Sequence, residues 1–204
     1  MRILPCGETA LLVECTPEQV APLHAALVAS TLPLVDVVPA ARTVLVRCAP
    51  SLLAPVRERL EAFLAAPLPP APPPAAGTTL AIEVRYDGPD LDRVAVLTGL
   101  DPADVIAAHA GRPWRVAFDG FAPGFAYLEG GDKRLAVPRR ETPRTEVPAG
   151  SVGLADGYSG IYPRPSPGGW QLIGRTTAVL WDAEREPPAL LRPGWWVRFV
   201  AVDQ

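Results

Sequence analysis

The spacing of apolar residues in the first third of the chain alternates between strand-like runs and helix-like stripes. Three short aliphatic runs predict strands, and two longer segments with apolar residues every three or four positions predict helices. Thr16 and Ser51 stand where helix N-caps belong, and Pro17 suits a first helical position. This order predicts an α+β domain of the ferredoxin-like sandwich type. The expected strands are residues 9–15, 34–40 and 42–48, and the expected helices are 16–30 and 51–66.

The pattern beyond position 77 is different. A strand is expected at 78–86, followed by short helices at 90–100 and 101–111, the second capped by Asp101 and stopped by Gly111. Short apolar runs between turns of glycine and proline then dominate, which is typical of an antiparallel β-barrel or β-sandwich. Examples of these runs are residues 114–118, 134–138, 151–155, 170–174, 177–181 and 195–200.

A proline-rich spacer separates the two patterns. Six of the ten residues in "PLPPAPPPAA", positions 67–76, are proline, which predicts an extended segment. One aromatic residue precedes this spacer and thirteen follow it. We therefore predict a small α+β domain at 1–66, a linker at 67–77 and an all-β barrel domain at 78–204.

The composition narrows the location and the class of partner. A formal net charge of -3 argues against nucleic acid as the main partner. Glu8 and Glu14 interrupt the N-terminal segment where a signal peptide needs an apolar run, and no uncharged apolar stretch is long enough for a bilayer. We expect a cytoplasmic protein whose cysteines, Cys6, Cys15 and Cys48, are reduced and mostly buried.

Charged residues exclude two common chemistries. The single lysine, Lys133 in "GGDKRL", fits neither a phosphate-binding P-loop nor a biotin acceptor hairpin, so the chain alone is not expected to be a P-loop ATPase. No two acids of the second half have the spacing of a metal pair, and no metal site is predicted. The acids near its loops, any of which could activate water, are Asp119, Glu129, Asp132, Glu141 and Glu146.

The segment "GFAPGFAYLEGGD", residues 120–132, places aromatic residues on what reads as a loop. Phe121, Phe125 and Tyr127 either plug a core beneath the loop or line a binding site. Gly124 permits close approach of a ligand and Pro123 stiffens the backbone. A rigid loop lined by aromatic residues would suit a flat ring that carries an amide.

Four arginines are candidate anion contacts. Arg139, Arg140 and Arg144 form either a solvated face or a carboxylate-binding group, since guanidinium groups bind carboxylates in bidentate fashion. Arg175 is a candidate anion contact or interface residue at a strand end. His109 is either a capping or core histidine or a general base near neutral pH.

Four segments of the second half, taken in order, resemble one known family. They are "FDGFAPGFAYL", "LAVPRRETPRTEVPAGSVGLA", "GYSGIYPRPSPGGWQLIGRT" and "LLRPGWWVRFV", and "GETALLVE" near the start agrees with them. The chain is thereby similar to the family that comprises the B subunit of 5-oxoprolinase and the kinase inhibitor KipI, also called the allophanate hydrolase subunit 1 family. The same module forms half of the carboxyltransferase domain of urea carboxylase. The resemblance implies a cyclophilin-like C-terminal barrel and a small α/β N-terminal domain.

The resemblance implies three possible functions. The favoured one is a subunit of a bacterial ATP-dependent 5-oxoprolinase, which acts with partners equivalent to the A and C subunits of that enzyme and binds ATP only at the level of the complex. The alternatives are a regulator that inhibits a histidine kinase, and a carboxyltransferase or allophanate-hydrolase-type module. Tyr158–Ser159 departs from the Gln–Thr pair common in the family, and Ala126 stands where proline is frequent.

The expected site combines these segments. His109 is the candidate catalytic residue, a role that the resemblance favours. The candidate substrate-binding residues are Phe121, Gly124, Phe125, Tyr127, Arg139, Arg140, Arg144, Ser151, Tyr158, Tyr162 and Arg175.

Overall fold

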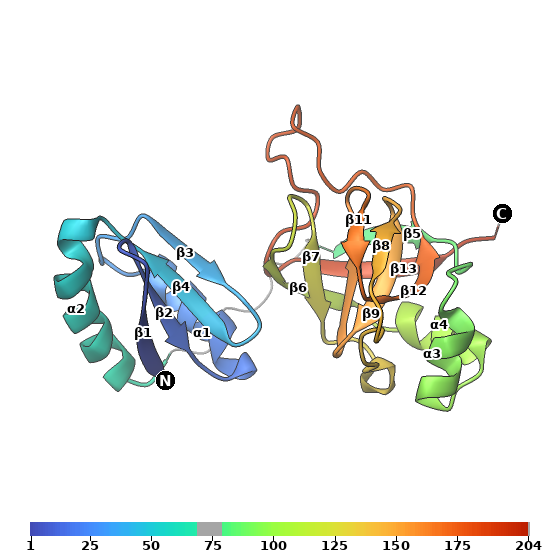
Figure 1. The fold of residues 1–204 in the computed structure, drawn as a ribbon, viewed down its shortest axis with the longest axis horizontal. Coiled ribbons are helices and arrows are strands. Elements are labelled where there is room, and N and C mark those ends of the chain that lie inside the picture. Colours follow the sequence, from blue (N-terminus) through green and yellow to red (C-terminus); the bar gives the residue numbers. More distant parts are fainter. Residues whose placement is uncertain (69–78, 204) are drawn as a thin grey trace. The chain divides into compact units, whose positions relative to one another are not determined.

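A computed structural model describes residues 1–68 and 79–203 of the chain (Figure 1). It divides into two compact units, Met1–Pro73 and Pro74–Gln204, which are described separately below. The predicted linker at 67–77 lies outside the described residues except for positions 67 and 68.

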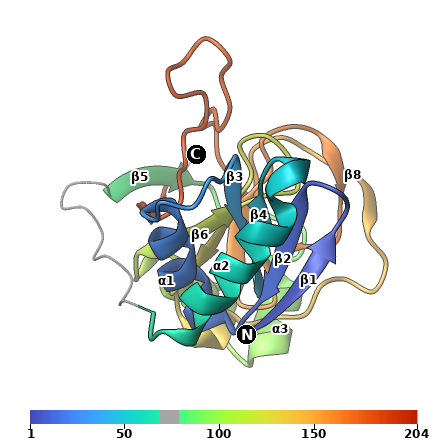
Figure 2. The same ribbon diagram turned by 90° about the vertical axis from the view of Figure 1, so that its left-hand side faces the viewer.

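The first unit is a four-stranded antiparallel sheet with the strand order β1-β2-β4-β3. Side chains from α1, α2 and one face of the sheet share a single core that includes Leu23, Leu60 and Val44. In Figure 2, α2 crosses in front of this sheet. Its elements are β1 (Arg2–Cys6), β2 (Ala10–Glu14), α1 (Pro17–Val28), β3 (Asp36–Pro39), β4 (Thr43–Arg47), the 3-10 turn η1 (Pro50–Leu52) and α2 (Leu53–Ala65).

Of the two helix N-caps predicted in this unit, one is correct and one is wrong. Thr16 is the N-cap of α1, and its N–H donates to the side chain of Gln19 at 2.9 Å. Ser51 does not cap α2, because it lies inside the 3-10 turn and Leu52 occupies the cap. The sequence analysis did not predict β1, an edge strand whose position tolerates Pro5.

The second unit is a seven-stranded sheet with the order β12-β9-β10-β7-β6-β13-β5, beside a small β11-β8 pair. All pairs in it are antiparallel except β13 with β5. Reciprocal 2.9 Å backbone hydrogen bonds between Arg85 and Arg175 join the two ends of the large sheet, which makes it nearly a closed barrel. The strands are β5 (Thr79–Val84), β6 (Trp114–Asp119), β7 (Ala126–Glu129), β8 (Arg144–Val147), β9 (Ser151–Ala155), β10 (Tyr158–Ile161), β11 (Ser166–Gly168), β12 (Gln171–Arg175) and β13 (Trp196–Ala201).

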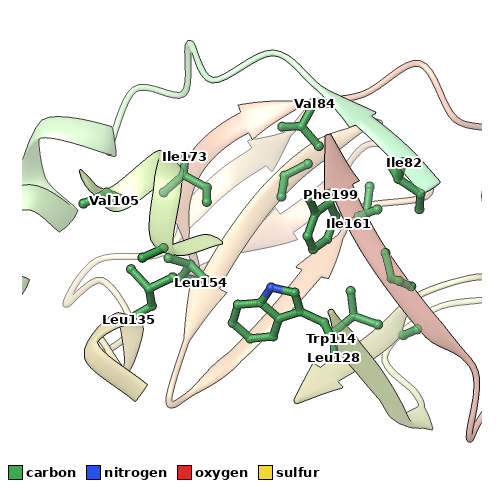
Figure 3. Close-up of a cluster of buried hydrophobic side chains, with 14 of the residues drawn as sticks. Ile82, Val84, Val105, Trp114, Leu128, Leu135, Leu154, Ile161, Ile173 and Phe199 are labelled. Atoms are coloured by element: carbon green, nitrogen blue, oxygen red, sulfur yellow. The ribbon is translucent and has the colours of Figure 1, made fainter. Parts of the chain in front are cut away.

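Two helices, α3 (Leu91–Thr98) and α4 (Pro102–Ala110), also belong to this unit, which is therefore mostly rather than entirely β. The Asp101 carboxylate caps α4 by accepting from the N–H of Asp104 at 2.8 Å, and Gly111 ends the helix, as the sequence predicts. Trp114, Phe199 and neighbouring aliphatic residues fill the barrel interior (Figure 3).

Some short runs and single residues differ from expectation. Residues 134–138 contain only the end of a 3-10 turn, and 177–181 contribute an isolated bridge through Trp181. Cys48 is buried and Cys15 half-buried, whereas Cys6 is exposed. Among the helices of the described residues, none combines the length and apolar character that a membrane crossing requires.

Candidate functional site

A second apolar layer lies on the outer side of the barrel sheet. Side chains alternate between the two faces of β9 and β12. Leu154 and Ile173 therefore pack inside the barrel, and Ala155 and Leu172 pack in this second layer. Both faces of these strands are therefore buried. We call the rings in and around this layer the aromatic cluster, which consists of Phe118, Phe121, Phe125, Tyr127, Tyr158, Tyr162 and Trp170.

The two phenylalanines of the loop differ sharply. Phe125 is 1% exposed and makes edge contacts with Tyr162 and Trp170 at centroid distances of 5.5 and 5.4 Å. Phe121 is 58% exposed and has a left-handed backbone with φ 66°, which is rare for a residue with a side chain. Gly124 has φ +82°, and a Cβ there would come within 2.8 Å of Trp181. Phe125 is thus a plug of the core, and Phe121 projects from a tightly constrained turn.

The tyrosines of the cluster occupy different depths. Tyr127 lies on β7, so this part of the expected loop is a strand, and its ring stacks on Phe118 at 4.4 Å. Tyr162 is buried, whereas Tyr127 and Tyr158 are half-buried. Desolvation raises the pKa of the Tyr158 phenol. Among the candidates of this cluster, Phe121, Tyr127 and Tyr158 reach the surface.

Asp119 ends β6 directly before this turn. Its side chain keeps solvent exposure, yet the surrounding protein desolvates the carboxylate and raises its pKa to about 6. A carboxyl group with such a pKa can exchange protons near neutral pH. The sequence placed Asp119 among five acids but had no signal to single it out.

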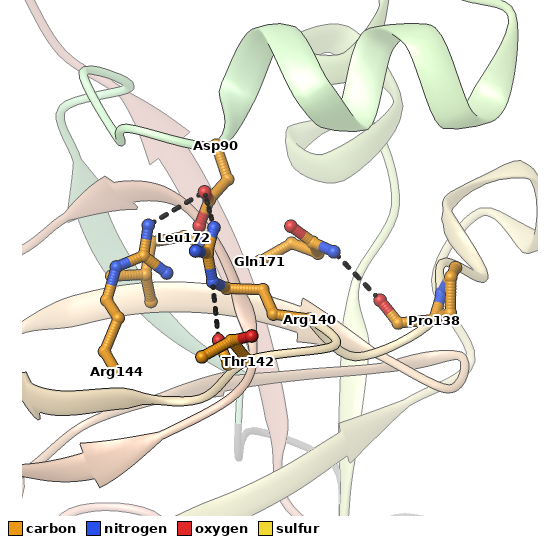
Figure 4. A network of polar contacts seen from close by, with 7 residues as sticks. All are labelled: Asp90, Pro138, Arg140, Thr142, Arg144, Gln171 and Leu172. Atoms are coloured by element: carbon orange, nitrogen blue, oxygen red, sulfur yellow. Dashed lines mark hydrogen bonds and ion pairs between the residues drawn. The ribbon is translucent and has the colours of Figure 1, made fainter.

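A buried carboxylate organises the predicted arginine group. Oδ1 of Asp90, a residue 3% exposed, accepts from Arg140 Nη1 at 2.9 Å and from Arg144 Nη2 at 2.8 Å (Figure 4). Its Oδ2 accepts from the N–H of Leu172 at 2.7 Å. Burial by itself raises the pKa of Asp90, but the hydrogen bonds and the two guanidinium charges outweigh burial and leave the pKa below its usual value.

The four candidate arginines do not converge on one point. Arg140 and Arg144 share Asp90, whereas Arg139 pairs with Asp156 at 3.0 Å. Arg175 pairs with Asp87 at 2.9 Å in a separate, largely exposed position. The sequence missed Asp90, because it lies 50 and 54 positions from its two arginine partners.

His109 lies in the barrel core and is 0% exposed. Its Nδ1 is 2.7 Å from the Tyr86 hydroxyl and its Nε2 is 2.8 Å from Ser159 Oγ. The imidazole stacks on Phe199 at 4.3 Å, and desolvation lowers its pKa to about 3. Because both ring nitrogens are occupied and the ring has no exposed surface, this geometry supports the core role that the sequence left open rather than the general base. Ser159, half of the unusual Tyr158–Ser159 pair, supplies one of the two hydrogen bonds.

Acid is expected to destabilise the second unit through His109. The folded pKa lies below the unfolded value near 6.5, so protons bind the unfolded chain more strongly and stability falls as pH drops below that value. Between pH 7 and pH 5 this single group is expected to cost about 2 kcal/mol. The measurement is urea unfolding at several pH values, followed by tryptophan fluorescence.

The matched control for this pH effect is His109→Gln, which keeps hydrogen-bonding groups and removes the titration. The raised pKa of Asp119 makes the second unit more stable as the pH falls, which opposes the effect of His109. The test is therefore the difference in pH-dependent stability between the unaltered chain and His109→Gln. Identical pH dependence in both proteins would contradict the assignment.

A hollow of about 360 Å³ lies beside the Asp90 network. We call it the arginine hollow, and its wall includes Arg93, Leu97, Pro138, Arg139, Arg140 and Gln171. Its volume is at the lower end for small-molecule sites. Gln171 was not among the predicted site residues.

Of the remaining candidates, Ser151 is 6% exposed and lies at the start of β9. Within the described residues, no group of three histidine, cysteine or acidic side chains is placed to hold a metal ion.

The fold and site define a class: a two-unit α+β protein with a mostly β, nearly closed barrel-like sheet and a basic hollow beside it. The family model for the carboxyltransferase domain, subdomain C and D, matches residues 1–191. The chain therefore belongs to this family.

Two bacterial relatives of the chain carry the same name. The chain is 48% identical over 117 residues to the B subunit of 5-oxoprolinase from Bacillus subtilis, covering 57% of this chain and 49% of that protein. It is 50% identical over 113 residues to the protein of that name in Escherichia coli O157:H7, covering 55% and 52% respectively. The chain thus spans about half the length of these relatives. The crystal structure of TTHA0988 matches with a TM-score of 0.76 and 37% identity, over 96% of this chain and 40% of that one.

Proposed function

We propose that the chain acts as the B subunit of a bacterial ATP-dependent 5-oxoprolinase, a hydrolase that adds water across the lactam C–N bond of 5-oxoproline to give glutamate. The supporting observation is the 48% and 50% identity to two bacterial proteins that are named as B subunits of 5-oxoprolinase. Because the chain spans about half the length of each relative, we propose, for this chain, the activity of the whole protein.

The proposed enzyme is a cytoplasmic hetero-oligomer. Partners equivalent to the A and C subunits of 5-oxoprolinase would complete it, because lactam opening is coupled to ATP and Lys133 lies in a 3-10 turn that lacks the P-loop pattern. ATP would therefore bind to a partner or to the assembled complex. No metal is part of the proposal.

The finer fold assignment belongs to the same proposal. We assign residues 1–66 to a ferredoxin-like domain, 67–77 to a linker and 78–204 to a cyclophilin-like barrel. Strand order and the shared core of α1 and α2 support the first domain, and the bonds that join Arg85 to Arg175 support the barrel.

The substrate would approach the residues that reach the surface. Phe121, Tyr127 and Tyr158 offer aromatic faces, and Arg139 and Arg140 offer positive charge beside the arginine hollow. Asp119 is the side chain here whose pKa suits proton transfer. The buried candidates Phe125, Ser151, Tyr162 and His109 would shape and support the site from beneath.

A carboxyltransferase-type activity is the second candidate, and the description of the matching family model favours it. It would require biotin carboxylase and carrier domains in addition. A KipI-like regulator is the third candidate, and it would inhibit autophosphorylation of a histidine kinase.

The test is reconstitution with candidate partner subunits from the same genome and measurement of glutamate formed from 5-oxoproline and ATP. We expect glutamate formation to require this chain. Equal rates with and without the chain would overturn the proposal. A purified chain that blocks kinase autophosphorylation, without supporting glutamate formation, would favour the regulator.

A further inference from the structure

The wall of the arginine hollow includes Gln171, a buried side chain whose Oε1 has no hydrogen-bond partner among the described residues. Gln171 is 4% exposed, and its Nε2 donates to the carbonyl of Pro138 at 3.1 Å. A carbonyl only accepts, so the amide nitrogen must face Pro138 and Oε1 must face away from it (Figure 4). Within the described part of the chain, this buried oxygen receives no hydrogen bond. A buried acceptor of this kind calls for a donor.

A cationic donor lines the same hollow. Arg140 is held in place by Asp90, which binds its Nη1, and its Nη2 has no partner within residues 1–68 and 79–203. The side chain is 34% exposed and therefore reachable from solvent. Three arginines and one acid, Glu141, line the hollow. Arg139 is paired with Asp156, and Asp90 is shared by Arg140 and Arg144, so a smaller net positive charge remains and favours an anion. Leu97 and Pro138 add apolar wall.

We infer that the arginine hollow binds a small carboxylic acid that carries an amide N–H close to its carboxylate. The carboxylate binds Arg140 Nη2, and the N–H donates to Gln171 Oε1. A guanidinium held by a buried acid and an amide held by a carbonyl are both fixed before the ligand arrives, which lowers the entropic cost of binding. This ligand class follows from the hollow. Its identification as 5-oxoproline, which has both groups, rests on the proposed function.

Three ligands distinguish the contact with Arg140 from the contact with Gln171. Their binding to the full chain is measured by calorimetry. The probes are L-5-oxoproline, its N-methyl derivative, which lacks the N–H, and 2-pyrrolidone, which lacks the carboxylate. We expect each deletion to weaken binding by roughly tenfold or more, because each removes a hydrogen bond to a group that no residue of 1–68 or 79–203 satisfies. Equal affinity of the parent and N-methyl compounds would overturn the inference. So would the absence of binding by every probe at concentrations raised in 10-fold steps to about 10 mM, a range in which even very weak ligands bind.

A variant tests whether Gln171 is the acceptor. In Gln171→Met the penalty for N-methylation should disappear, while 2-pyrrolidone should still bind more weakly than 5-oxoproline. Gln19→Met, which changes a glutamine of the first unit, is the matched control and should bind as the unaltered chain does. A penalty that persists in Gln171→Met would contradict the assignment. If that variant does not fold, the comparison of ligands on the unaltered chain still decides.

These measurements are independent of enzyme activity. A reconstituted enzyme that needs this chain, combined with unselective binding, would reject the hollow and leave the proposed function standing. Selective binding to the chain, combined with activity that does not need it, would reject the proposed function and leave the hollow as a carboxylate site.

Discussion

Replacing Phe125 with alanine is expected to lower the free energy of unfolding of the second unit by about 3–5 kcal/mol. The ring is 1% exposed and lies among Tyr127, Tyr162 and Trp170, so its removal leaves a cavity that these neighbours cannot fill without losing their own contacts. Urea unfolding followed by tryptophan fluorescence measures this, because every tryptophan lies beyond position 78.

Phe121→Ala is the matched control, since it removes the same side chain four positions earlier. Phe121 is 58% exposed, so this change is expected to alter stability by less than about 1 kcal/mol. If the site extends over the turn, Phe121→Ala lowers turnover of the reconstituted enzyme without affecting folding. Equal destabilisation by the two substitutions would contradict the assignment of one ring to the core and the other to the surface.

Asp90→Asn is expected to destabilise the second unit by about 3 kcal/mol, near the lower limit for a broken buried ion pair. The change leaves two guanidinium groups close together without their shared counter-charge. The partial exposure of Arg140 and Arg144, 34% and 22%, limits the cost. Thermal or urea unfolding at low and high salt measures it, and added salt should recover part of the loss by screening the two arginines.

Asp87→Asn provides the control for this charge effect. Asp87 also lies between two arginines, Arg85 and Arg175, at 2.9 Å from each, but its side chain is 33% exposed against 4% for Asp90. Exposed ion pairs contribute about 0–1 kcal/mol, so the control should cost far less. Similar losses at both positions would show that burial does not set the strength of the Asp90 network.

Local sequence signals predicted the elements that depend on near neighbours. The capping residues of α1 and α4, Thr16 and Asp101, were found because a cap acts over three positions. Several strands of the second half, among them β6, β9, β12 and β13, follow from short apolar runs between turns of glycine and proline. Prediction failed at the start of α2, where a 3-10 turn precedes the helix and Leu52 rather than Ser51 is the cap.

The candidate site was predicted in part. The ordered motifs led to the correct family, and the arginine segment does line a hollow. Gln171 and Asp90 were missed, because a single glutamine or aspartate has no distinctive local pattern. Ser159 had a weak signal in its departure from the usual family pair, but its bond to His109 spans 50 positions.

The sequence by itself determined the caps of α1 and α4, the two contrasting halves and the family, because each is encoded in residues close together along the chain or in a fixed order of motifs. Only the tertiary structure decided which loop phenylalanine is buried, that Asp90 is the counter-charge of Arg140 and Arg144, and that Gln171 leaves an acceptor unpaired within the part of the chain that the structure describes. Burial and pairing arise from contacts between segments distant in sequence, and such contacts exist only when the barrel closes.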